Sequence, residues 1–183
     1  MTTRLINPAD EFRGQSTLLR LLTLDDVTDR YVAWLNDPQV NRYLETRFRA
    51  QTSETVREFV AGMVASSDSY LFGIIALDDR AHVGNLKIGP INRHHEFADV
   101  SYFIGDRSRW GKGLATDAIR LSVEVAFSRL KLHRVQAGVY EHNVGSCRAL
   151  ERAGFALEGR FSRQLRNVDG NWEDHVWYGR VRD

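Results

Sequence analysis

Residues 105–116 are the part of the sequence best suited to chemistry, because glycines at positions 111 and 113 flank Lys112. The run before them is rich in β-forming residues and the run after them has helical apolar spacing, so a strand is expected to lead into a helix here. Glycine lets the backbone approach a ligand closely, and the first N–H groups of a helix have no partner within it. Such a helix start binds anions, above all phosphate, and Arg109 and Lys112 add positive charge. The plainer interpretation is a glycine-containing turn with solvated charges.

Two common nucleotide-binding loops do not match this segment. A P-loop requires G-x-x-x-x-G-K-[ST], which is absent, and the dinucleotide fingerprint requires a third glycine where Thr116 stands. The sequence therefore indicates a phosphate-binding loop of another type.

The elements that would position this loop follow from apolar patterns on either side of it. On the helix expected over 111–130, Leu114, Ala118, Leu121 and Val125 share one face. Other helices are expected from Thr23 to about residue 36, from residue 52 or 53 onward, and over 144–153. Seven strands are expected, over 17–22, 70–77, 82–91, 97–104, 135–140, 155–165 and 172–181. The fold class is α/β (α+β), in a single domain over 1–183 with a loose N-terminal extension over 1–15.

Composition limits the classes of function. The chain has 183 residues, of which 43% are hydrophobic and 27% charged, as is typical of a folded globular domain. A net charge of +1 gives no general attraction to nucleic acid or to a membrane, and neither is expected as a partner. Cys147 is the single cysteine and no signal peptide is evident, so a cytoplasmic protein without an intrachain disulfide is expected. Because no H-x-x-x-H pattern or cysteine pair occurs, no metal site is expected.

Several short motifs occur in an order that resembles a known family. The glycine loop continues as L-A-T-D-A over 114–118, and N-V-G-S over 143–146 is followed by G-F at 154–155 and E-G at 158–159. Together with W-L-N-D-P over 34–38 and G-N-W-E-D over 170–174, these motifs resemble the Rim-type branch of the GNAT superfamily of N-acetyltransferases, which includes ribosomal-protein alanine N-acetyltransferases. Ser108 stands where the pyrophosphate motif of the superfamily usually has glutamine or arginine, a position that is permissive in this branch. The resemblance covers nearly the whole chain.

The resemblance implies a GNAT fold, with a mixed and mostly antiparallel sheet of about seven strands that is splayed at its centre and flanked by helices. It implies acetyl-CoA as co-substrate and a primary amine as acceptor. The main-chain groups of Phe103 and Ile104 are then expected to pair with the pantetheine arm. Asn143 is expected either to bond the pantetheine or to cap the helix that follows it. The pyrophosphate is expected on the loop of Arg109, Trp110, Gly111, Lys112, Gly113, Leu114 and Ala115.

Two residues are candidates for proton transfer by the same resemblance. Ser146 is expected to protonate the leaving thiolate, and Asp99 to accept the amine proton through water, although ordinary helix and strand roles stay open for both. Better-studied relatives have a glutamate where Gly138 stands and a tyrosine where Leu150 stands. The absence of that pair keeps a second hypothesis open, a non-catalytic acetyl-CoA-binding sensor or interaction module.

The acceptor is expected near the first helix, the loop after it and the following hairpin, at Trp34, Tyr43, Glu45 and Asn85. Three classes of acceptor are compatible with the sequence: a protein N-terminus, an amino sugar carried on a nucleotide, and a small polyamine-like amine. A polyamine site should be rich in carboxylates, of which few occur in these segments. The oligomeric state, monomer or homodimer, is left open.

Overall fold

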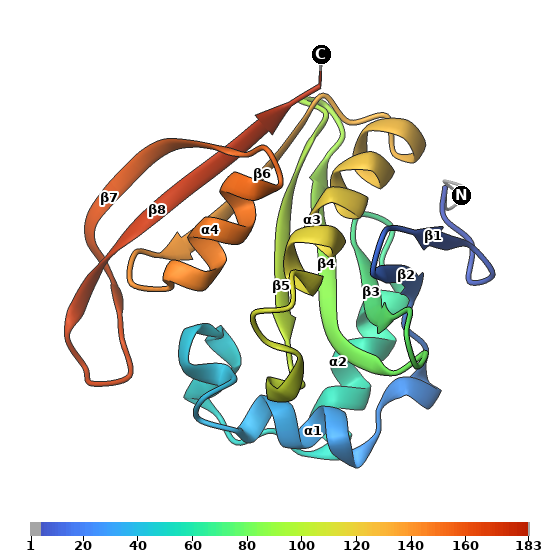
Figure 1. Cartoon of the computed structure of the whole chain (residues 1–183), viewed down its shortest axis with the longest axis horizontal. Helices are drawn as coiled ribbons and strands as arrows, with labels where there is room; N and C mark the ends of the chain where they lie inside the picture. Colours follow the sequence, from blue (N-terminus) through green and yellow to red (C-terminus); the bar gives the residue numbers. More distant parts are fainter. Residues whose placement is uncertain (1–4, 183) are drawn as a thin grey trace.

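A computed structural model describes residues 5–182 and shows one sheet flanked by helices (Figure 1). The strands are β1 Glu11–Arg13, β2 Thr17–Leu21, β3 Tyr70–Ala76, β4 His82–Asn92, β5 Phe97–Ile104, β6 Arg134–Tyr140, β7 Ala156–Arg166 and β8 Trp172–Val181. The α-helices are α1 Asp29–Asn36, α2 Ser53–Ala65, α3 Leu114–Glu124 and α4 Val144–Arg152. The eight strands lie in the order β1-β2-β3-β4-β5-β6-β8-β7. No helix in residues 5–182 has both the length and the apolar character needed to cross a membrane.

β5 and β6 pair only at their starts and then diverge. They are the one parallel pair among the strands of residues 5–182, and their registered pairs run from Phe97 with Arg134 to Asp99 with Gln136. Parallel neighbours require a crossover connection, and α3 lies in the chain between the two strands. Beyond Asp99 the two strands border a V-shaped opening in the sheet, which we call the splay. At the splay, main-chain groups on the facing edges of β5 and β6 are not paired with each other.

Two apolar clusters cover the two faces of the sheet. The larger cluster contains side chains of α3 and α4, including the fully buried Ile119 and Leu150. The smaller cluster contains side chains of α1 and α2, including Val60, which is also fully buried. Along β5, Val100 belongs to the larger cluster whereas Phe103 packs against the smaller one. The splay therefore connects the two faces.

The N-terminal segment differs from the sequence-based expectation. β1 pairs with β2 and adds an eighth strand to the sheet, and Ile6 is fully buried in the larger cluster. The Asp117 carboxylate on α3 accepts hydrogen bonds from the backbone N–H groups of Gln15, Ser16 and Thr17, at 3.2, 2.9 and 2.8 Å. Because this buried carboxylate needs donors and the segment supplies them, the expectation of a loose extension is wrong for residues 5–15. Residues 1–4 lie outside the described range.

Two helices begin later than expected. Thr23 caps a 3₁₀ turn, Leu24–Asp26, and α1 begins only after a second cap at Thr28. α3 begins after Gly113, because Gly111 and Gly113 have φ angles of 73° and 80°, which lie outside the helical region. The two glycines thus form a turn that precedes the helix.

Candidate active site

Two cavities meet at the splay. The α2 cavity, of about 640 Å³, is lined by residues that include Leu35, Glu45, Val56, Lys87, Ser101 and His175. The α3 cavity, of about 850 Å³, is lined by residues that include Gly111, Gly113, Ala115, Gly145, Arg148 and Arg152. Six residues line both cavities: Tyr43, Leu44, Tyr102, Phe103, Asn143 and Ser146. A ligand on one side of the sheet can therefore reach a ligand on the other side through the splay.

The start of α3 forms an open cradle of backbone N–H groups. A Cβ atom built on Gly111 or Gly113 would meet no other atom within 4 Å. Within the described part of the chain, the amides of Gly111, Lys112 and Gly113 donate to no other group. The amides of the first turn of α3 have no intrahelical partner either, and the helix dipole adds partial positive charge there. This arrangement has the properties of a binding site for a phosphate or diphosphate.

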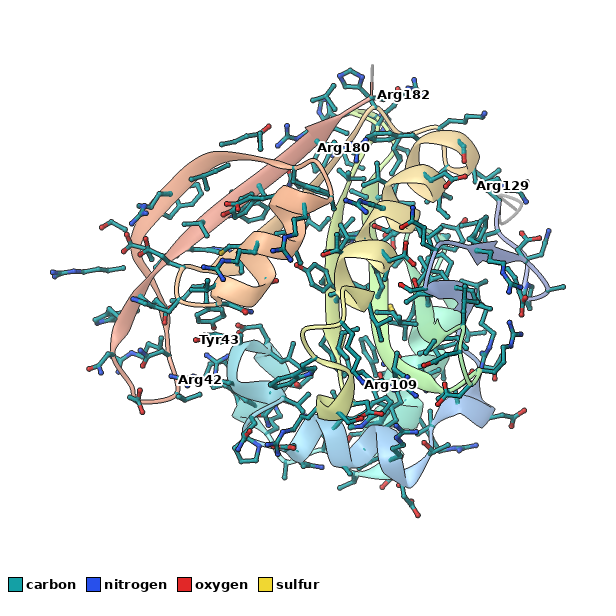
Figure 2. All side chains as sticks on the ribbon, viewed as in Figure 1. Arg42, Tyr43, Arg109, Arg129, Arg180 and Arg182 are labelled. Atoms are coloured by element: carbon teal, nitrogen blue, oxygen red, sulfur yellow. The ribbon has the colours of Figure 1, made fainter. Side chains whose placement is uncertain are left out.

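Positive side chains reach the α3 cavity from several elements. Three arginines that line it are Arg42, Arg148 and Arg152. Arg109 also lines it, but its guanidinium pairs with Asp78 at 2.6 Å and with Asp79, so carboxylates of the turn between β3 and β4 balance its charge. Lys112 is exposed to solvent and does not line the cavity. Figure 2 shows Arg42 and Tyr43 on the light-blue segment that follows α1, whereas Arg109 lies below the start of α3.

Main-chain groups of β5 face the splay at alternate residues. The Gly105 N–H donates to a carbonyl of β4, so the main-chain groups of Phe103 also face β4 and those of Tyr102 and Ile104 face the splay. The Ile104 carbonyl accepts a hydrogen bond from Trp110 Nε1 at 2.8 Å. The groups available to a ligand are therefore those of Tyr102 and the N–H of Ile104. Of the two residues expected to pair with pantetheine, Phe103 contributes its side chain instead of its backbone.

Ser146, Tyr102 and Asn143 form a hydrogen-bonded group where the two cavities join. The Tyr102 hydroxyl lies 2.6 Å from Ser146 Oγ. Asn143 Oδ1 accepts from the Ser146 N–H at 3.3 Å and so caps α4. Burial raises the pKa of the Tyr102 hydroxyl, with a smaller opposing effect of its bond to Ser146, so the phenol stays protonated. Sequence analysis missed Tyr102, although the alternation of side chains along β5 places it on the same face of the sheet as Val100, the face covered by α3 and α4.

Asp99 does not belong to this group. It lies in the last registered pair of β5 and β6, opposite Gln136, whose Nε2 donates to Asp99 Oδ1 at 2.9 Å. It lines neither cavity, because it stands where the two strands are still paired. This placement separates Asp99 from Ser146 and gives no support to a role in accepting the amine proton.

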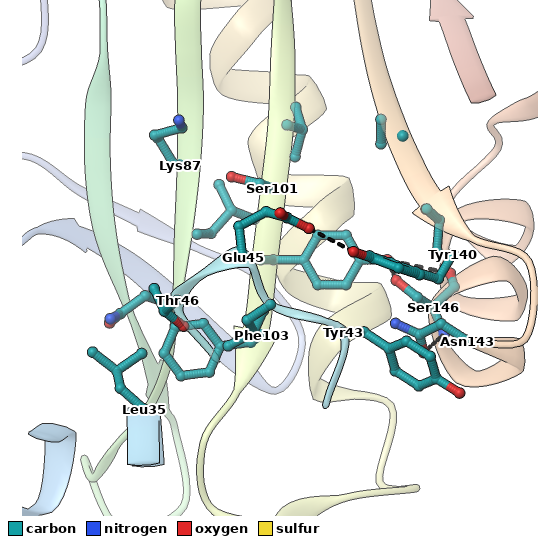
Figure 3. A pocket seen from close by; sticks show the side chains of 18 of the residues that line it. Leu35, Tyr43, Glu45, Thr46, Lys87, Ser101, Phe103, Tyr140, Asn143 and Ser146 are labelled. Atoms are coloured by element: carbon teal, nitrogen blue, oxygen red, sulfur yellow. Dashed lines mark hydrogen bonds between the residues drawn. The ribbon is translucent and has the colours of Figure 1, made fainter. Parts of the chain in front are cut away.

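Three of the four residues expected to contact an acceptor line the α2 cavity: Tyr43, Glu45 and Asn85. Glu45 Oε1 accepts a hydrogen bond from the Tyr140 hydroxyl at 2.7 Å, drawn as a dashed line in Figure 3. Asn85 Oδ1 lies 2.7 Å from His82 Nε2, while Asn85 Nδ2 is buried without a hydrogen-bond partner among the described residues. Of these groups, the Glu45 carboxylate is the one that an acceptor in this cavity would meet.

The fourth residue, Trp34, is part of the core. It is 8% exposed in the smaller apolar cluster, and its ring centroid lies 5.2 Å from that of His82. Its indole packs directly on Gly105, where a Cβ atom would collide with the ring. Trp34 lines neither cavity. The expectation that it contacts an acceptor is therefore not met.

Two further polar groups of the α2 cavity were not selected from the sequence, Lys87 on β4 and His175 on β8. His175 stands opposite Tyr140 in the pairing of β6 with β8. No local motif marks its position, because its place in the cavity depends on the pairing of these strands.

Comparison with known proteins agrees with this geometry. The family model of the acetyltransferase (GNAT) domain matches residues 17–156. Probable N-acetyltransferase YjcK of Bacillus subtilis is 43% identical over 109 residues, which cover 59% of this chain and 59% of that protein. The ribosomal protein uS5-alanine N-acetyltransferase of Escherichia coli is 29% identical over 109 residues, which cover 59% of this chain and 55% of that protein. The chain thus matches less than two thirds of the length of either relative.

A solved structure shares the fold. Mycobacterium smegmatis RimJ in complex with CoA-disulfide has a TM-score of 0.79 and 24% identity, covering 94% of this chain and 86% of that one. The expected fold class, a mixed and mostly antiparallel sheet with flanking helices, is confirmed, with eight strands instead of about seven. The family model spans most of the chain, and a ribosomal-protein alanine acetyltransferase is among its relatives. The chain therefore belongs to the GNAT acetyltransferase family.

Proposed function

We propose that the protein transfers the acetyl group of acetyl-CoA directly onto a primary amine bound in the α2 cavity. The observation that carries this proposal is the junction of the two cavities at the splay, with Ser146 and Tyr102 between them. One cavity has a cradle for a diphosphate, and the other is a largely apolar space of a size that holds small ligands. Group transfer requires that two substrates meet in one place, which this junction allows.

The chain has groups to hold and orient the donor. Acetyl-CoA, when bound, supplies an activated thioester. The backbone of Gly111 and Gly113 would hold the diphosphate, and the main-chain groups of Tyr102 and Ile104 would hold the pantetheine arm. An N–H group on this strand edge would stabilise negative charge on the carbonyl oxygen. The Ser146 hydroxyl, supported by the neutral Tyr102 phenol, would protonate the leaving thiolate.

The state of Cys147 favours direct transfer over an acyl-enzyme route. Cys147 is the only cysteine of the chain and lines neither cavity. Burial raises the pKa of its thiol, so the thiolate form is disfavoured at neutral pH. Because the thiolate is the nucleophile, this side chain is a poor acceptor of the acetyl group.

The charges of the α2 cavity favour a protein N-terminus as acceptor over a polyamine. Among the described residues that line it, Glu45 is the only carboxylate, and Lys87 adds a positive charge. A polyamine would require several carboxylates, whereas an α-amino group has a pKa near 8 and about a tenth of it is neutral at pH 7. A nucleotide-linked amino sugar is the second acceptor class to be tested.

A panel of amines tests the proposal. Thiol release from acetyl-CoA is measured with peptides that start with alanine, serine or methionine, with nucleotide-linked amino sugars, and with spermidine. We expect release with at least one peptide and only background release with spermidine. Binding of acetyl-CoA without release for any amine would instead favour the sensor hypothesis.

A pair of glycine variants tests the diphosphate cradle. Gly113 and Gly170 have φ angles of 80° and 78°, and a Cβ atom on either would meet nothing within 4 Å, but Gly170 lies between β7 and β8, away from the cradle. Gly113→Ala and Gly170→Ala therefore add a similar backbone strain of about 1–2 kcal/mol. We expect the acetyl-CoA affinity measured by calorimetry to fall about tenfold for Gly113→Ala only, equivalent to about 1.4 kcal/mol. Equal affinities in the two variants would contradict the cradle.

A further inference from the structure

Building on the proposed amine transfer, we infer that Nε2 of His175 is the general base that accepts the proton of the attacking amine. His175 lines the α2 cavity together with Gly138 and Ser146. Four observations support this role: the position of its ring, the orientation of its lone pair, its protonation state, and the lack of another suitable base in the cavity.

Gly138 gives the imidazole its place. Gly138 follows Gln136, the last residue of β6 that pairs with β5, so it borders the splay. A Cβ atom on Gly138 would collide with Nε2 of His175. The imidazole also packs against Trp177, with the ring centroids 5.1 Å apart. The absence of a side chain at position 138 therefore lets Nε2 lie at the edge of the splay.

Gln164 fixes the tautomer of His175. Its Oε1 lies 2.6 Å from Nδ1 of the imidazole. An amide oxygen only accepts hydrogen bonds, so Nδ1 carries the hydrogen and Nε2 carries the lone pair. The nitrogen beside Gly138 is therefore the basic one.

A bulge in β7 brings Gln164 to this position. Phe161 pairs with His175 and Leu165 pairs with the residue two before it, so residues 162–164 stand opposite Asp174 alone. Within the bulge Arg163 has a φ of 49°, and its N–H donates to Asp174 Oδ1 at 2.8 Å. Bulges of this kind redirect side chains and are frequent next to active sites.

The protonation state of His175 suits a base at neutral pH. Burial lowers the pKa of the imidazole, and the negative charge of Glu45 opposes this in part. The ring is therefore largely neutral at pH 7, and its free nitrogen can accept a proton.

No other group of the α2 cavity offers a comparable lone pair. The remaining titratable side chains that line it are Tyr31, Tyr43, Glu45, Lys87, Tyr102 and Tyr140. Tyrosine and lysine side chains ordinarily lose their protons only near pH 10. Glu45 Oε1 is already engaged, because it accepts a hydrogen bond from the Tyr140 hydroxyl at 2.7 Å and lies 3.8 Å from Arg47 Nη1.

The transfer balances with His175 and Ser146 as the two proton partners. The lone pair of the amine nitrogen forms the bond to the acetyl carbon, and the nitrogen gives a proton to Nε2 of His175. The carbon–sulfur bond breaks with its electron pair on sulfur, which takes the proton of Ser146 Oγ. His175 then releases its proton to water and Ser146 regains one from water, so that the products are an N-acetylated amine and a free thiol.

The pH dependence of kcat/KM tests the inference in the intact protein. With a peptide acceptor of the proposed class, both His175 and the amine must be unprotonated, so log kcat/KM should rise with a slope of two below the pKa of His175. Above that pKa the slope should be one until the amine itself is neutral. His175→Ala should lower kcat about 100-fold, and its plot of log kcat/KM against pH should have a slope of one throughout. The variant should keep the wild-type affinity for acetyl-CoA and recover part of its rate when imidazole is added. His94→Ala replaces an exposed histidine outside both cavities and should keep the wild-type profile.

Two measurements do not depend on replacing His175. Gly138→Ala should displace the imidazole and lower kcat at least tenfold with His175 still present. Nitrogen NMR of the protein without ligands should show the Nδ1–H tautomer of His175 with a pKa below the ordinary value, and Gln164→Leu should remove the tautomer preference.

Each possible outcome decides the question. If the wild type acetylates the peptide but His175→Ala keeps the wild-type rate and profile, the base assignment is overturned and the proposed function stands. If Asp99→Asn removes the second ionisation and His175→Ala does not, the role belongs to Asp99. If the wild type acetylates no amine of the panel, the proposed function fails and the inference fails with it.

Discussion

Replacement of Asp117 should weaken the attachment of the helix that carries the diphosphate cradle. Asp117 is 7% exposed and lies in the first turn of α3. Its Oδ2 accepts from Ser16 N–H, Thr17 N–H and Thr17 Oγ1 at 2.9, 2.8 and 2.8 Å, and its Oδ1 accepts from Gln15 N–H at 3.2 Å. Thr17 is fully buried, so water cannot replace the bonds to its two donors.

The magnitude follows from these bonds. A buried donor that loses its acceptor costs about 1–3 kcal/mol, and Asp117→Ala leaves two such donors on Thr17. We therefore expect the free energy of unfolding to fall by about 3–5 kcal/mol in Asp117→Ala. Asp117→Asn keeps one acceptor oxygen but turns an NH₂ group toward the Gln15 amide, so we expect a loss of about 1–2 kcal/mol. Urea unfolding of both variants beside the wild type measures the two differences.

The pH dependence gives a second readout. Burial alone raises the pKa of Asp117, but the hydrogen bonds from residues 15–17 outweigh it and hold the pKa below the ordinary value. A lowered folded-state pKa contributes stability that is complete above the unfolded pKa of about 3.9 and is lost as the pH falls through the folded pKa. The difference between wild type and Asp117→Asn should thus be constant between pH 7 and about pH 5 and shrink below about pH 4. A loss under about 1 kcal/mol in Asp117→Ala at pH 7 would refute the reasoning.

The cavity junction, Trp34 and the half-buried His82 give further tests. Ser146→Ala and Tyr102→Phe should each lower kcat about 10- to 100-fold without changing acetyl-CoA affinity, and an unchanged rate in Ser146→Ala would exclude it as the acid. Because the Trp34 indole is part of the core, Trp34→Ala should lower the free energy of unfolding in urea by about 3–5 kcal/mol. The folded variant should keep the wild-type KM for the amine, and a large increase in KM would contradict the core assignment. Burial lowers the pKa of the His82 imidazole, and the hydrogen bond to Asn85 opposes this shift in part. The contribution of His82 to the free energy of unfolding is therefore complete above the unfolded pKa of about 6.5 and is lost as the pH falls through the folded pKa. The urea midpoint should therefore fall more between pH 7 and pH 5 in the wild type than in His82→Gln, and equal falls would speak against burial of a neutral imidazole.

Sequence reasoning was most reliable where local chemistry determines local structure. The strand that ends at Ile104 depends on residues close in sequence, as does the cap formed by Asn143, which was one of its two expected roles. The helix expected from about residue 111 begins only after Gly113, because the φ angles of the two glycines are not helical. Sequence reasoning also placed Ser146 in the first turn of a helix, but it could not show the Tyr102 hydroxyl 2.6 Å away, which depends on how α4 packs beside β5.

Long-range register explains the expectations that were not met. Asp99 was expected near the amine, but it lies in the last pair before β5 and β6 separate, and no local signal marks that point. Trp34 is of a residue type that often contacts ligands, but its indole fills the space beside Gly105, where there is no side chain. The place of His175 depends on a glycine on one neighbouring strand and a bulge on the other, so a search for motifs does not find it.

The two cavities open on opposite faces of the sheet, since one is bounded by α1 and α2 and the other by α3 and α4. Neither of the two proposed substrates would therefore block the route of the other, and both could be held at once. Steady-state rates measured at several fixed concentrations of each substrate should give intersecting double-reciprocal lines, the pattern of a ternary complex. An inhibitor designed to occupy both cavities would have to pass through the splay between β5 and β6.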